Sequence, residues 1–123
     1  MSNIRIEIWE KPFDLQVNYD CFEGEELLEN QILAIERFNG AKIDVTLEKV
    51  KKYCCEMSKG KVSVDEITNV FKFIMPTSVF VPRNEDKRIV AIMCDFKFDI
   101  EHGIGIVFEN EEFRKIVSQD ELL

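Results

Sequence analysis

The sequence predicts an α+β fold: an antiparallel sheet, made of an N-terminal hairpin and a C-terminal meander, with about three helices packed on one face. Apolar residues alternate with period two at both ends of the chain, and recur at steps of three or four in between. Strand segments that are separated from helical segments in this way are typical of α+β domains. A chain of 123 residues without repeat or linker has the length of one domain, so we expect residues 1–123 to form a single domain.

The first segment predicts a β-hairpin. Residues 4–8 alternate apolar and polar side chains, as a half-buried strand does. Trp9 extends this strand, as a packing residue and not as a ligand platform, until Lys11-Pro12 ends it. Residues 15–19 form a second extended run that can pair back with the first, and residues 20–24 follow as a loop.

The next segment, from about Gly24, predicts an amphipathic helix. Its apolar side chains recur at helical spacing at Leu28, Ile32, Ile35 and Phe38. Three carboxylates in the first turns complement the helix dipole, namely Glu25, Glu26 and Glu29. Asn39-Gly40 ends the helix, because glycine suits a left-handed C-terminal cap.

Two more helices are predicted before the chain returns to strands. One begins near Asp44, which can cap it, and ends at Lys59-Gly60. The other begins at Ser63, where residues 63–66 have the spacing of a capping box, and Pro76 prevents its continuation.

The last part of the chain predicts four strands, at residues 78–81, 88–98, 104–108 and 113–117. The longest has one fully apolar face, formed by Val90, Ile92, Cys94, Phe96 and Phe98. Its other face begins with apolar side chains and ends with Asp95 and Lys97, so we expect this face to be covered at one end and solvated at the other.

The composition indicates an acidic protein of the cytoplasm. Sixteen basic and 24 acidic side chains give a net charge of −8, with no basic stripe to neutralise phosphates, so nucleic acid is not an expected partner. No apolar run approaches the roughly 20 residues of a membrane helix. The N-terminus lacks the layout of a signal peptide, so we expect a cytoplasmic location and no membrane contact.

The four cysteines are predicted to be free thiols. They form no Cys-x-x-Cys pair, and one histidine is too few for a mixed zinc site, so no metal or other cofactor is expected. Three of them occupy positions where a small apolar side chain packs well, namely Cys21, Cys54 and Cys94.

The one cluster with potential for proton transfer or metal binding surrounds the single histidine. It contains Asp95, Asp99, Glu101 and His102, followed by Gly103. A carboxylate beside an imidazole can poise a general base, and three carboxylates with one imidazole could hold a divalent ion. No serine or cysteine is placed by the sequence as a nucleophile. The structural alternative, which we favour, assigns Asp99 to a turn cap, Glu101 or His102 to loop amides, and Gly103 to a positive φ.

The same turn carries a family resemblance. Phe98-Asp99-Ile100-Glu101-His102-Gly103, with the apolar strand that follows, resembles the aromatic-Asp-x-Glu-His-Gly signature of a bacterial family of small cytoplasmic proteins of unknown function. Phe98 stands where tryptophan is common in that family. The resemblance continues through residues 75–79, and more weakly at Tyr19-Asp20 and Gln31. It implies an immunity-protein-like role, with Asp99, Glu101, His102 and Gly103 as signature positions and no assigned activity.

These observations lead to three functional hypotheses. The first is a non-enzymatic protein that binds another protein, such as a basic toxin domain, through acidic side chains that include Glu25, Glu26 and Glu29. The second is a metal-assisted or acid–base enzyme that uses the cluster around His102. The third is a homodimer that pairs through an unpaired strand at residues 78–81 or 113–117.

Overall fold

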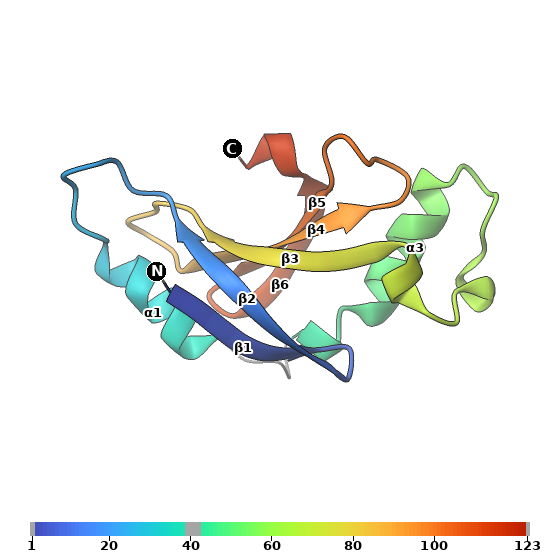
Figure 1. Ribbon diagram of the computed structural model, residues 1–123, viewed down its shortest axis with the longest axis horizontal. Coiled ribbons are helices and arrows are strands. Elements are labelled where there is room, and N and C mark those ends of the chain that lie inside the picture. Colours follow the sequence, from blue (N-terminus) through green and yellow to red (C-terminus); the bar gives the residue numbers. More distant parts are fainter. Residues whose placement is uncertain (1, 39–42, 123) are drawn as a thin grey trace.

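The computed structural model of the chain describes residues 2–38 and 43–122. Its centre is one six-stranded sheet in which the strands lie in chain order (Figure 1). The strands are β1 (Ser2–Ile8), β2 (Lys11–Tyr19), β3 (Ile74–Val81), β4 (Ile89–Phe96), β5 (Ile104–Glu109) and β6 (Glu112–Ser118). The described residues also form the α-helices α1 (Glu29–Arg37) and α3 (Leu47–Met57), and the 3₁₀ turns η1 (Val64–Glu66), η2 (Val70–Lys72) and η3 (Gln119–Glu121).

The predicted fold class was wrong in the number of helices. Within the described residues the sheet carries two α-helices, and the segment predicted as the third helix forms the two short turns η1 and η2. The segment contains two separate caps, and each is followed by a single 3₁₀ turn. The Glu66 carboxylate accepts from the Ser63 amide at 3.2 Å, and the Asn69 side chain accepts from the Phe71 amide at 3.1 Å.

The sheet is also not wholly antiparallel. β2 and β3 pair in parallel, whereas every other neighbouring pair is antiparallel. The long connection through the helices brings the chain back to the end of the sheet at which β2 began, as a parallel pair requires. β3 therefore lies inside the sheet, so the prediction that residues 78–81 lie unpaired was wrong, whereas residues 113–117 belong to the edge strand β6.

Pro76 lies within β3, whereas it was expected to lie between a helix and the following strand. β3 begins at Ile74, and its register against β4 shifts between Pro76 and Ser78. A proline cannot donate a ladder hydrogen bond, and an irregularity in the pairing is the usual place for it.

Trp9 turns the chain and does not extend β1. Trp9 (φ 50°) and Glu10 (φ 70°) form a two-residue turn, since Ile8 pairs directly with Lys11. Positive φ angles at both central residues give such a turn the twist of the strands it joins. The indole is buried and donates to the Thr46 hydroxyl at 3.2 Å, which confirms that Trp9 is a packing residue.

The helices begin later than predicted. α1 starts at Glu29, so Glu25 and Glu26 lie in the preceding loop and not in a helical turn. α3 starts at Leu47, and the Asp44 carboxylate accepts from the Trp9 amide at 3.1 Å instead of capping that helix. The predicted end of α1 at Asn39-Gly40 lies outside the described residues.

α1 packs only part of its predicted stripe on the core, through Ile35 and Phe38. Gln31 and Ala34 are its buried residues, whereas Ile32 is 44% exposed. The Gln31 amide donates to the carbonyl oxygens of Asp20 (3.0 Å) and Val81 (3.2 Å), where the parallel strands β2 and β3 end. These bonds satisfy a buried polar group and fix which side of α1 faces the sheet.

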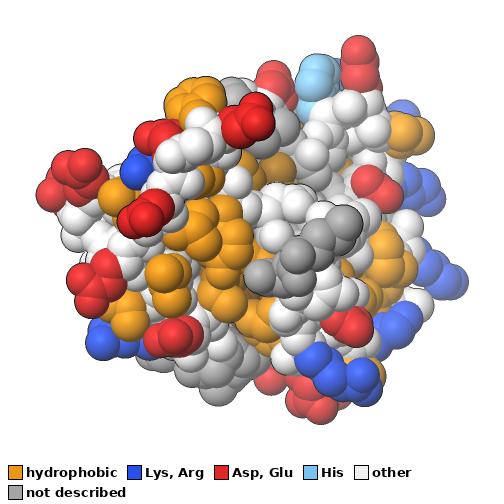
Figure 2. All heavy atoms as spheres, turned by 60° about the vertical axis from the view of Figure 1, so that its left-hand side comes forward, with side chains coloured by type: hydrophobic (Ala, Val, Ile, Leu, Met, Phe, Trp, Pro, Cys, Tyr) orange, Lys and Arg blue, Asp and Glu red, His pale blue; other side chains and the backbone are white. Residues whose placement is uncertain are grey.

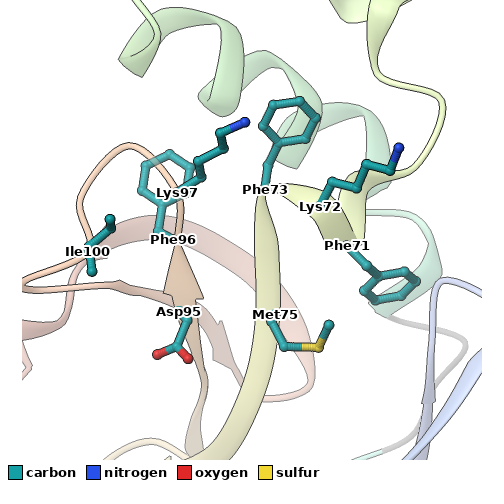
Figure 3. A pocket seen from close by; sticks show the side chains of 8 residues that line it. All are labelled: Phe71, Lys72, Phe73, Met75, Asp95, Phe96, Lys97 and Ile100. Carbon is teal, nitrogen blue, oxygen red and sulfur yellow. The ribbon is translucent and has the colours of Figure 1, made fainter.

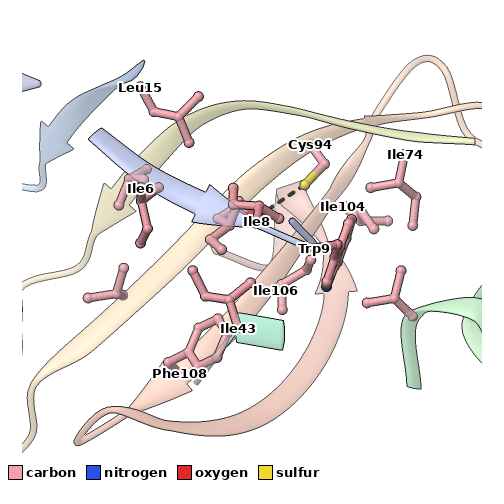
Figure 4. Packing of buried hydrophobic residues seen from close by; sticks show 14 of the residues in the cluster. Ile6, Ile8, Trp9, Leu15, Ile43, Ile74, Cys94, Ile104, Ile106 and Phe108 are labelled. Atoms are coloured by element: carbon pink, nitrogen blue, oxygen red, sulfur yellow. Dashed lines mark hydrogen bonds between the residues drawn. The ribbon is translucent and has the colours of Figure 1, made fainter. Parts of the chain in front are cut away.

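The core lies mainly between the helices and one face of the sheet, as Figure 4 shows for part of it. The predicted alternation along β4 is confirmed: Val90, Ile92, Cys94 and Phe96 join this main core. The opposite face holds a smaller cluster of Ala91, Met93, Val107 and Val117, against which Leu122 packs.

All four cysteines are free thiols. Cys54 and Cys94 are buried, and burial raises the pKa of the Cys54 thiol to about 11 and also raises that of Cys94. Cys21 was predicted to pack like a small apolar residue, but it lies half-buried in the loop before α1. Among the described residues, no helix is long and apolar enough to cross a membrane.

Candidate functional site

The turn between β4 and β5 holds the predicted signature residues, and Asp99 organises it. Its carboxylate accepts from the His102 amide at 3.2 Å and lies 3.0 Å from the His102 Nδ1 atom. Its carbonyl oxygen accepts from the Gly103 amide at 2.9 Å. Asp99 thus caps the turn and also orients the imidazole.

The His102 ring forms a solvent-exposed ion pair. Its side chain is 44% exposed, against 27% for Asp99. The hydrogen bond that the Asp99 carboxylate accepts from the ring raises the pKa of His102 above its ordinary value, with further contributions from the charges of Asp120, Asp99 and Glu101. The Ser118 hydroxyl is the main cause of the lowered pKa of Asp120, so this carboxylate is ionised next to the histidine. The site therefore favours the imidazolium form.

The backbone conformation at position 103 requires a glycine. Its φ is +67°, and a Cβ atom there would lie 2.6 Å from the Cys94 carbonyl oxygen. The same oxygen accepts from the Gln119 side-chain amide at 3.0 Å, and that amide also lies 3.3 Å from the Ile104 carbonyl oxygen. Gln119 thus holds the end of β4 against the start of β5, and leaves no space for a side chain at Gly103.

The cluster predicted from the sequence does not form one group. Asp99 and His102 come together, and Glu101 is exposed on the same turn. Asp95 lies on β4 opposite Met75 and lines a separate groove. No three histidine, cysteine, aspartate or glutamate side chains in the described ranges are placed to hold a metal ion. Of the four residues that the enzyme hypothesis uses, Asp99 and His102 are therefore in contact, and Asp95 lies apart from them on β4.

The predicted acidic residues lie on the loop before α1 and at its start. Glu25, Glu26 and Glu29 are all exposed. One carboxylate oxygen of Glu25 lies 3.6 Å from the Arg83 guanidinium, which also donates to the Glu26 carbonyl oxygen at 3.0 Å. Arg83 thus holds the loop in place while the Glu26 carboxylate stays directed to solvent.

Apolar side chains lie among these acids. Phe22 is 77% exposed in the loop, and Ile32 is exposed on α1. Figure 2 brings this side of the molecule forward and shows carboxylates around an apolar area. We name Phe22, Glu23, Glu25, Glu26, Glu29 and Ile32 the acidic face. Exposed apolar side chains set among carboxylates are typical of interaction surfaces.

A second surface feature is a groove between the start of β3 and the end of β4, with a volume of about 310 Å³. Apolar side chains line it together with two lysines, Lys72 and Lys97, and with Asp95 (Figure 3). The groove and the acidic face share no residue, so the molecule has two separate candidate surfaces.

A comparison with protein families matches residues 2–123 to the Domain of unknown function (DUF6985). The chain belongs to the DUF6985 family. This agrees with the expectation of an uncharacterised family. Comparison of the DUF6985 chain with curated proteins finds no match, and comparison with solved structures finds none either.

Sequence reasoning missed the structural role of two glutamines in this DUF6985 chain, although Gln31 was among the positions of the family resemblance. Gln31 joins α1 to the ends of β2 and β3, and Gln119 joins the ends of β4 and β5. Gln31 interrupts the apolar pattern of a predicted helix, and this is the signal that could have identified it. Gln119 follows the last strand without any comparable pattern.

Proposed function

We propose that this DUF6985 chain is a non-enzymatic protein-binding protein that presents its acidic face to a basic surface of a partner. The observation that carries the proposal is the position of Phe22 and Ile32, exposed among the acids of the loop and α1. Apolar side chains at the centre of an interface supply desolvation, and surrounding charges supply orientation and a fast encounter.

The face is well prepared for binding because part of it is already ordered. Arg83 fixes the loop through Glu25 and the Glu26 carbonyl oxygen, and Asn30 donates to the Glu85 carbonyl oxygen at 2.8 Å. A surface that is ordered before binding loses less conformational entropy in the complex. The net charge of −8 further favours a basic partner.

Within this proposal, the partner is a basic toxin domain and the chain is a bacterial immunity protein. The resemblance of the Asp99–Gly103 turn to the immunity-like family supports this reading. The mechanism is occlusion: the acidic face covers basic groups that the toxin needs for its activity. A neighbouring gene for a large secreted toxin is expected, and a solitary gene in all relatives would contradict the immunity role.

A pull-down from the lysate of the source cell tests the binding function. The test variant reverses Glu23, Glu26 and Glu29 to lysine, leaving Glu25 with its Arg83 contact. The matched control reverses the exposed Glu7, Glu56 and Asp65, which lie on other elements. We expect wild type and control to retain one stoichiometric basic protein that the test variant loses. Equal retention by all three, or no stoichiometric partner for wild type, would contradict the proposal.

A further inference from the structure

The groove between β3 and β4 has the lining of a binding site for an apolar side chain. Phe71, Phe73, Met75 and Ile100 contribute apolar surface, and Ile100 is 87% exposed. Figure 3 shows Phe73 lying near Lys97, whose ammonium is 5.2 Å from the centre of the Phe73 ring. Exposed apolar surface in a concave site of about 310 Å³ is suited to one inserted aromatic side chain.

The charges at the groove favour an acidic ligand. Lys72 and Lys97 point to the same side of the groove, and Asp95 points to the other (Figure 3). Neither lysine has a carboxylate within 4.0 Å in residues 2–38 and 43–122. Two uncompensated ammonium groups in a chain of net charge −8 mark a local site for carboxylates.

A segment with the complementary chemistry lies in the loop before α1. Residues 22–25 form a tight turn in which the Glu25 amide donates to the Phe22 carbonyl oxygen at 3.0 Å. The Phe22 amide donates to the Glu25 carboxylate, also at 3.0 Å, so the turn is closed from both sides. Phe22 therefore projects from a preordered turn, with the exposed carboxylates of Glu23 and Glu26 beside it.

In Figure 1 the loop before α1 lies at the left, whereas the start of β3 and the end of β4, which border the groove, lie toward the right. The turn of one chain therefore cannot reach its own groove. We propose that the groove receives the turn of a second copy of this chain, with Phe22 inserted among the apolar side chains and Glu23 and Glu26 facing Lys72 and Lys97. The contact joins two different surfaces, so copies associate head to tail.

The association is weak, because a single turn in a groove buries less surface than the roughly 1,200 Å² of the smallest stable interfaces. We expect a dissociation constant on the order of 0.1 mM at physiological salt. The inference goes beyond the proposed function and does not depend on it. The two are connected because self-association covers Phe22 until a tighter partner displaces the second copy.

Sedimentation equilibrium of the full chain, from about 0.01 to 1 mM around the expected dissociation constant, tests the contact. The turn variant Phe22→Ala and the groove variant Lys72→Glu/Lys97→Glu should each stay monomeric. A mixture of the two should form a dimer, because the turn variant keeps a groove and the groove variant keeps a turn. The control Lys52→Glu/Lys61→Glu has the same charge change on exposed residues outside the groove and should associate like wild type.

A wild type that stays monomeric at the highest concentration would overturn the inference. So would a groove variant that associates like wild type, or a mixture that remains monomeric while each variant keeps the circular dichroism spectrum of wild type. The groove variant in the lysate pull-down separates this contact from the proposed function. It should lose self-association and still retain the basic partner.

Discussion

At the residue scale, the β4–β5 turn depends on a backbone conformation and on an ion pair. Gly103 has a φ that other residues rarely adopt, in a space closed by Cys94 and Gln119. The Asp99 carboxylate contacts both the backbone amide and the imidazole ring of His102. Asp99, His102 and Gly103 therefore have structural roles in this turn.

Gly103→Ala should lower the free energy of unfolding by about 2–4 kcal/mol, because it adds a clash with a backbone oxygen to the strain of a positive φ. Gly24→Ala is the matched control: its φ is +87°, but no atom lies within 4 Å of the added Cβ. This control should cost only about 1 kcal/mol. Urea denaturation measures both values, and equal losses would show that the closed space around Gly103 contributes nothing.

His102 should titrate above its ordinary pKa of 6.5, and Asp99→Asn should lower its pKa more than Asp120→Asn does. A raised native pKa means that the ion pair stabilises the fold fully below the ordinary pKa, and that this contribution is lost as pH rises through the native value. NMR titration of the ring protons measures these pKa values. A pKa at or below the ordinary value in wild type would contradict the ion pair.

At the scale of elements, the position of α1 is set by one buried amide. Gln31 accepts from the Leu28 amide at 3.0 Å and donates to the carbonyl oxygens at the ends of β2 and β3. A single side chain thereby connects the start of a helix with the parallel strand pair. Because Gln31 faces the sheet, the neighbouring Ile32 points to solvent, where it belongs to the acidic face.

Gln31→Leu should therefore lower the free energy of unfolding by about 2–3 kcal/mol, although leucine is more apolar, because it removes the hydrogen bonds that the buried amide makes with the Leu28 amide and with the carbonyl oxygens of Asp20 and Val81. Asn30→Ala is the control at a neighbouring position, where the lost bond to Glu85 is exposed and should cost less than about 1 kcal/mol. Chemical denaturation distinguishes the two. A Gln31→Leu variant as stable as wild type would show that burial alone positions α1.

At the scale of the whole molecule, the cysteines differ in burial according to the part of the fold in which they lie. Cys94 lies in an interior strand and Cys54 on the inner side of α3, whereas Cys21 lies in the loop next to the acidic face. Burial raises the pKa values of Cys54 and Cys94, so little reactive thiolate forms at these positions in the folded state.

A disulfide reagent at mildly alkaline pH should therefore label the half-buried Cys21 and Cys55 first, and label Cys54 and Cys94 only as the whole chain unfolds. Cys21→Ser should remove one early-labelled position and leave the labelling of Cys55 in place. Mass spectrometry of digested protein identifies the labelled positions over time. Rapid labelling of Cys94 without denaturant would show that β4 opens locally, against the interior position found here.

Local patterns in the sequence determined much of this protein. The alternation along β4, the end of a helix before Lys59-Gly60 and the positive φ of Gly103 depend on near neighbours, and all three were predicted. The acidic charge and the free thiols also follow from the sequence without any knowledge of contacts.

Only the tertiary structure decided the features that depend on distant contacts. The parallel pairing of β2 with β3 and the contacts of the buried Gln31 join residues far apart in the chain, and Asp95 lies on β4 whereas His102 lies in the turn after it. The third predicted helix failed for the same reason, since β3 draws its last residues into the sheet. Periodicity shows which side chains of an element are apolar, but the tertiary packing decides which of these side chains are buried.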